Sequence, residues 1–164
     1  MTHRSVAPTR WGRITEPATV ATDVVLGTLA FVLAVRLVDK SAADTSAATA
    51  SMAGAMLATG VAALIGALAH GTDPDRDAVL RARLWRGALC ATGFIGAACV
   101  TSVACFATHG SVRAVLLAVA AIKLIVFMRR ITRRPEFRIA AADYGVALTI
   151  LLVAALREMI ERRA

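Results

Sequence analysis

The sequence predicts an all-α fold: a polytopic membrane protein built as a bundle of five transmembrane helices. The first observation is composition, because 58% of the 164 residues are apolar, whereas a soluble domain averages roughly 45–50%. The second is that the apolar residues form long blocks with almost no charges, instead of periodic stripes. The third is that the prolines lie outside these blocks or at their edges, at Pro8, Pro17, Pro74 and Pro135.

Each block is long enough for a membrane crossing. A helix needs roughly 20 apolar residues to cross a hydrocarbon core of about 30 Å. Residues 1–16 are expected to form a basic N-terminal tail, 17–157 the membrane domain and 158–164 a short charged C-terminal tail. Within the membrane domain the blocks predict helices over residues 18–38, 47–70, 86–107, 111–128 and 139–157.

The connections between the predicted helices differ in character. The second is the longest, and its stretch "AVLRARLWR" alternates apolar residues with arginines. This pattern is typical of an interfacial segment, with Trp85 in the headgroup layer. The fourth connection, "RRITRRPEFR", is strongly basic. We expect Gly71 to end the second helix in the left-handed conformation that glycine adopts readily.

The basic residues predict an orientation. The net charge is +8, but no basic face carries interleaved aromatic residues, which argues against a nucleic-acid partner. With the N-terminus cytoplasmic, the inner segments hold twelve arginines and the outer segments six lysines and arginines. The positive-inside rule therefore favours a cytoplasmic N-terminus and an external C-terminus in a bacterial cytoplasmic membrane. The expected partners are the bilayer and anionic lipids at the basic loops; a homo-oligomer or a membrane partner protein stays open.

Polar residues inside the apolar blocks form the candidate site. A charged side chain at a helix centre costs roughly 2.5–3.5 kcal/mol on insertion scales, so such residues are expected to face the bundle and find partners. We expect His70 to reach Asp23 or Asp143, and Lys123 to pair with Asp143. Counted from the predicted helix ends, all five helices place a polar residue at similar depth in the cytoplasmic half, and these residues are Asp23, His70, Arg86, Lys123, Asp143 and Tyr144.

Four roles remain open for this polar cluster. Its pairs could lock the bundle, or form a small-ligand or proton-linked site. A third role is metal-dependent hydrolysis of a lipid-like substrate, with Asp23, His70 and Asp143 as zinc ligands. The fourth acts wholly through partner proteins. The chain has no HExxH motif and no paired histidines, so we expect no cofactor, and zinc is the alternative.

A set of short motifs in order along the chain resembles a known group. These are "ITEPATVATDVVL" at the first helix, "AALIGALAHG" at the end of the second, Trp85 before the third, Lys123 in the fourth and "DYGVAL" in the fifth. Together they resemble small bacterial integral membrane proteins grouped as a domain of unknown function, over roughly residues 14–155. That resemblance implies no particular activity.

A more distant likeness is to the membrane hydrolase superfamily of alkaline ceramidases and progestin/adiponectin-type receptors. It implies zinc-dependent hydrolysis. Those proteins have seven helices and a zinc-binding HxxxH pair, whereas this chain has five predicted helices and no HxxxH.

Overall fold

A computed structural model describes residue 14 and residues 16–161, and within them it contains helices and no strand. Each helix is long and apolar enough to cross a membrane, with a mean hydropathy between 1.9 and 2.2 over its most apolar window. The predicted all-α fold of five membrane-spanning helices is confirmed. The helices are α1 (Pro17–Asp44), α2 (Ala47–Gly71), α3 (Pro74–Ala107), α4 (Gly110–Arg133) and α5 (Phe137–Glu161).

Local sequence explains where the helices begin. Pro17 opens α1, where a missing backbone N–H costs nothing. The Ser46 hydroxyl caps α2 by accepting the backbone N–H of Thr49 at 3.3 Å. The Asp73 carboxylate caps α3 by accepting the backbone N–H of Asp75 at 2.9 Å. Each cap satisfies a donor that the helix itself leaves unpaired.

The structure differs from two details of the predicted connections. The stretch "AVLRARLWR", predicted to precede the third helix, is itself helical and belongs to α3, which has a break just before this stretch at Asp77 (φ −132°, ψ 45°). Gly71 ends α2 without a left-handed turn, because extended Thr72 instead donates its backbone N–H to the Leu68 carbonyl at 3.1 Å. Apolar blocks mark the hydrocarbon core, whereas backbone hydrogen bonding continues past it into the charged flanks. The predicted basic tail over residues 1–16 lies almost wholly outside the described residues.

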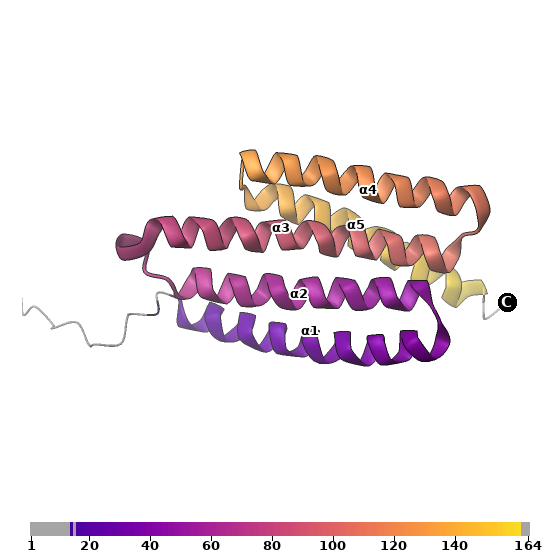
Figure 1. Ribbon diagram of the computed structural model, residues 1–164, viewed down its shortest axis with the longest axis horizontal. Coiled ribbons are helices and arrows are strands. Elements are labelled where there is room, and N and C mark those ends of the chain that lie inside the picture. Colours follow the sequence, from indigo (N-terminus) through magenta and orange to yellow (C-terminus); the bar gives the residue numbers. More distant parts are fainter. Residues whose placement is uncertain (1–13, 15, 162–164) are drawn as a thin grey trace, which may run out of the picture.

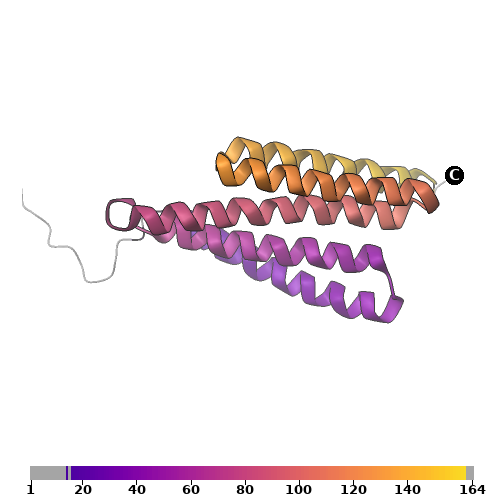
Figure 2. The same ribbon diagram turned by 45° about the horizontal axis from the view of Figure 1, so that its top comes forward.

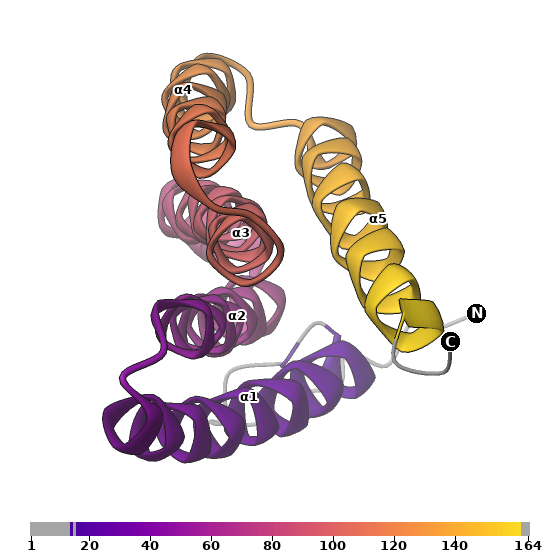
Figure 3. The same ribbon diagram turned by 90° about the vertical axis from the view of Figure 1, so that its right-hand side faces the viewer.

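The helices run up and down along one axis, with α3 at the centre (Figure 1). Helix α2 packs on one side of α3, and α4 and α5 pack on the other (Figure 3). Among the described helices, α1 packs only on α2. Helices α4 and α5 contact each other over a small area. The start of α1 and the α2–α3 and α4–α5 connections lie at one end of the bundle, which we call the arginine end (Figures 1 and 2).

Small residues let α1 approach α2 closely. A Cβ on Gly60 would lie 2.9 Å from the ring of Phe31, so only glycine fits there.

The outward surface of α1 is apolar, with Val25, Leu29 and Val35 all more than half exposed. A soluble monomer rarely exposes apolar surface on this scale. The face suits lipid, since lipid chains are as apolar as leucine and helix contact then depends on small residues.

Candidate functional site

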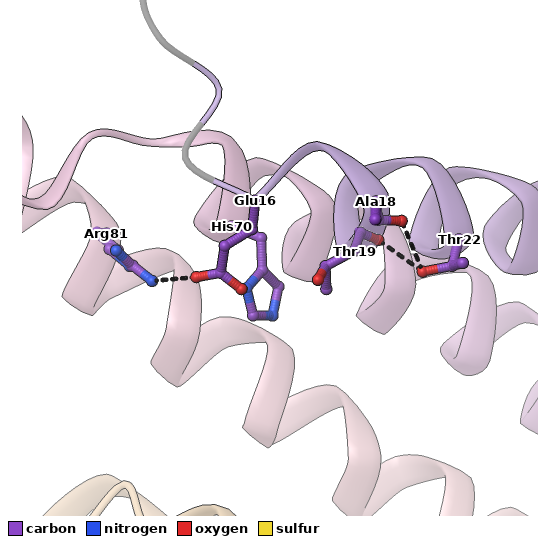
Figure 4. A network of polar contacts seen from close by, with 6 residues as sticks. All are labelled: Glu16, Ala18, Thr19, Thr22, His70 and Arg81. Atoms are coloured by element: carbon purple, nitrogen blue, oxygen red, sulfur yellow. Dashed lines mark hydrogen bonds and ion pairs between the residues drawn. The ribbon is translucent and has the colours of Figure 1, made fainter.

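The first polar group joins three helix ends at the arginine end. One Glu16 oxygen accepts a hydrogen bond from His70 Nδ1 at 2.8 Å, and the other accepts from Arg81 Nη2 at 3.0 Å (Figure 4). Glu16 precedes α1, His70 lies in the last turn of α2, and Arg81 lies near the start of α3. We call these three residues the Glu16 triad. It ties together the start of α1, the end of α2 and the first turns of α3.

Aromatic rings lie against the Glu16 triad. The His70 ring meets Trp85 edge to face, with centroids 5.8 Å apart and planes at 84°. Trp85 in turn lies 6.4 Å from the ring of Phe137 at the start of α5. Trp85 therefore links the α1–α2 side of the bundle to α5.

The second polar group is an ion pair between α4 and α5. Lys123 Nζ lies 2.8 Å from both carboxylate oxygens of Asp143. The side chains are only 23% and 11% exposed, respectively. A Cβ on Gly96 of α3 would lie 2.6 Å from Asp143 Oδ2 and 2.9 Å from Lys123 Nζ. The ion pair therefore packs directly against the backbone of Gly96, where a side chain would collide with it.

A groove between α4 and α5 has this ion pair in its wall. It has a volume of about 660 Å³ and is open to the surroundings. Its other walls are largely apolar, and Arg130 and Arg138 line it toward the arginine end. The apolar lining residues are Val119, Ile122, Val126, Phe127, Ile139, Ala142 and Val146. An amphipathic molecule would meet both kinds of surface that it needs here.

The other predicted site residues lie apart from these two groups. Asp23 is half-buried, with Oδ2 3.1 Å from where a Cβ on Gly66 would lie, and it forms no hydrogen bond or ion pair with the described residues. Arg86 is exposed and has no ion pair within the described part of the chain. Tyr144 packs against an apolar core cluster that includes Ile95.

The six residues predicted to share one cluster are therefore divided. The pairing of Lys123 with Asp143 is confirmed, but His70 pairs with Glu16 where we expected Asp23 or Asp143. The reason is depth. His70 lies against Trp85 of α3, whereas Asp143 lies against Gly96 of the same helix. Trp85 and Gly96 are about 16 Å apart along α3 at 1.5 Å per residue, so His70 and Asp143 lie at different depths.

The same separation bears on the zinc alternative. Among the described residues no group of three or more histidine, cysteine, aspartate or glutamate side chains is arranged to hold a metal ion. Asp23, His70 and Asp143 thus do not come together as a ligand set. The sequence also contains no HxxxH pair.

Sequence reasoning missed Glu16 and Arg81. The sequence places Glu16 in the predicted N-terminal tail, and Arg81 in the connection before the third predicted helix. The available signal was Pro17, which marks the first turn of a helix and so places Glu16 at the level where the antiparallel α2 ends. A carboxylate at that level is a natural partner for a histidine in the last turn of α2.

Comparison with known proteins gives a family and no closer relative. No curated protein and no solved structure matches the chain significantly. The likeness to alkaline ceramidases and progestin/adiponectin-type receptors therefore stays a prediction. Residues 18–164, which include all five helices except the first residue of α1, match the family of unknown function DUF6962. The chain is an integral membrane protein that belongs to this family.

Proposed function

We propose that this protein is a membrane-embedded binding protein for an amphipathic small molecule, which enters the groove between α4 and α5 sideways from the bilayer. The observation that carries the proposal is the Lys123–Asp143 pair, a charged pair in the wall of an otherwise largely apolar groove of about 660 Å³. Ligand pockets commonly combine apolar walls with a few placed polar groups, in volumes of roughly 300–1,000 Å³.

The position of the ion pair favours binding over a purely structural lock. Both side chains line the groove and keep part of their surface open to it. An ammonium group offers three donors and a carboxylate about four acceptor positions, so the pair leaves hydrogen-bonding capacity unused. Unused capacity facing hydrocarbon is unfavourable. A bound molecule with a hydroxyl, carbonyl or phosphate group would satisfy it.

The proposal includes an orientation, with the arginine end on the cytoplasmic side of a bacterial cytoplasmic membrane. Most of the described basic side chains gather in the α2–α3 and α4–α5 regions, whereas Arg36, Lys40, Arg113 and Arg157 lie toward the opposite end. The positive-inside rule supports this assignment. The polar end of the groove then faces the cytoplasmic headgroup layer.

Blocking the groove tests the proposal. Ala142 lines it, whereas the neighbouring Ala141 is also exposed but does not line it. We expect Ala142→Trp to abolish photolabelling of the α4 and α5 peptides by a diazirine-bearing single-chain lipid, and the matched Ala141→Trp variant to label like the unmodified protein. Equal labelling of both variants, or labelling spread evenly over all five helices, would overturn it. Far-UV circular dichroism confirms that each variant is folded.

A further inference from the structure

The arginine end of the groove carries concentrated positive charge. A second hollow of about 520 Å³ adjoins the groove and shares Val126 and Arg130 with it. Its remaining lining consists of Arg129, Arg133 and Arg134. The apolar groove therefore borders an arginine-lined hollow at the arginine end.

These charges are not neutralised by carboxylates of the described chain. Arg129, Arg130, Arg133 and Arg134 are exposed and form no ion pair with any described residue. Arg138 has a nearby carboxylate, but Glu136 Oε2 lies 3.7 Å away and the Arg138 side chain is 92% exposed. Such a run attracts anions, and a guanidinium group matches phosphate oxygens with two parallel hydrogen bonds.

We infer that the occupant of the groove is an anionic phospholipid of the bilayer, with its phosphate in the arginine-lined hollow and an acyl chain along the groove. This inference rests on the proposed function and names its ligand. The spacing fits: Arg130 and Lys123 are seven residues apart on α4, about 10 Å along the helix. The Lys123–Asp143 pair therefore meets the lipid below its phosphate, where the polar linkage of the glycerol backbone gives way to the chain.

A free anion does not fit this arrangement as well as a lipid does. Inorganic phosphate would use the arginines but leave the apolar groove unfilled. A soluble anion also has no reason to occupy the apolar groove between two helices that are apolar enough to span a membrane. The combined shape, a basic hollow beside an apolar groove, matches a molecule with one charged end and one apolar end.

The test compares lipids of different charge on the full-length protein. Native mass spectrometry of the purified protein with dioleoyl phosphatidylglycerol or dioleoyl phosphatidylcholine should show a preference of about tenfold for the anionic lipid, the scale that one or two arginine contacts supply at a membrane. The variant Arg130→Gln/Arg133→Gln should lose this preference. The control Arg83→Gln/Arg86→Gln removes the same charge from exposed α3 positions outside both hollows and should keep it.

The outcomes separate this inference from the proposed function. Equal binding of both lipids, each blocked by Ala142→Trp, would refute the anionic ligand while leaving the groove proposal standing. Equal loss of preference in the two double variants would also refute it, because the attraction would then be diffuse. Binding of neither lipid would refute both proposals. Displacement of the anionic lipid by excess inorganic phosphate would assign the hollow to a free anion instead.

Discussion

Removing one charge of the Lys123–Asp143 pair should destabilise the protein far more than removing both. In Lys123→Met the Asp143 carboxylate loses its partner, and in Asp143→Asn the Lys123 ammonium loses its partner. Both side chains are less than a quarter exposed, and they rest on the backbone of α3 at Gly96.

The magnitude follows from what remains unpaired. A lone charge within a membrane-spanning helix costs roughly 2.5–3.5 kcal/mol on insertion scales, and the partial opening of the groove reduces this, so we expect about 2–3 kcal/mol for each single variant. The double variant Lys123→Met/Asp143→Asn carries no charge and should lose only about 1 kcal/mol. The double-mutant cycle then gives a coupling energy of about 3–5 kcal/mol.

Reversible unfolding in mixed dodecyl sulfate and dodecyl maltoside micelles, followed by far-UV circular dichroism, measures these free energies. The cycle removes effects that each substitution has on the unfolded state, provided that neither variant creates new contacts. Single variants within about 0.5 kcal/mol of the unmodified protein, or a double variant whose loss equals the sum of the singles, would refute the reasoning. The pair would then contribute nothing to holding α4 and α5 on α3.

Three further predictions concern other parts of the bundle. Gly96→Ala places a methyl group 2.6 Å from Asp143 Oδ2 and should cost about 1–3 kcal/mol in the same unfolding assay. In the control Gly54→Ala nothing lies within 4 Å of the new methyl group, so this change should be neutral or slightly stabilising. Equal losses in the two variants would contradict the packing of the ion pair on Gly96. Glu16→Gln should speed hydrogen exchange at the start of α1. It should change the free energy of unfolding by less than about 1 kcal/mol, because the Glu16 triad is partly exposed. The control Glu136→Gln should leave the exchange at α1 unchanged. In a cysteine-free background, a membrane-impermeant maleimide should label Ser111→Cys but not Asp75→Cys in intact cells; the reverse result would invert the orientation.

The Lys123–Asp143 ion pair could be predicted from the sequence, but its packing against Gly96 could not. Lys123 is the only charge in residues 114–128 and Asp143 the only charge in residues 139–156. Opposite charges on consecutive antiparallel helices must find each other or stay unpaired in lipid. Gly96 gives no such signal, since a glycine within an apolar block looks the same whether it faces lipid, a neighbouring helix or an ion pair. Its role emerges only from the three-dimensional approach of α4 and α5 to α3.

The position of His70 was harder to predict, because its depth depends on where the helices end. Counting apolar residues places the third helix at residue 86, yet α3 begins at Pro74 and extends well beyond the hydrocarbon core. That extension brings Arg81 to the level of His70 and Glu16, where a triad forms outside the apolar blocks. Charge patterns inside the blocks therefore predict contacts inside the membrane, but they carry no information about the capping contacts at its boundary.

The packing around α3 explains why the groove between α4 and α5 is wider than the space between α1 and α2. On the α1–α2 side, Gly60 admits the ring of Phe31 and Gly66 admits the carboxylate of Asp23, so the two helices pack closely there. A smaller hollow of about 400 Å³ remains between them toward the α1–α2 connection. Helices α4 and α5 pack on α3 and hardly on each other, and the Lys123–Asp143 pair bridges the gap. The pair thus holds two helices at a fixed separation while leaving the space between them open. A ligand that enters this space meets the same charges that keep it open, so occupancy and the stability of the α4–α5 region should rise together.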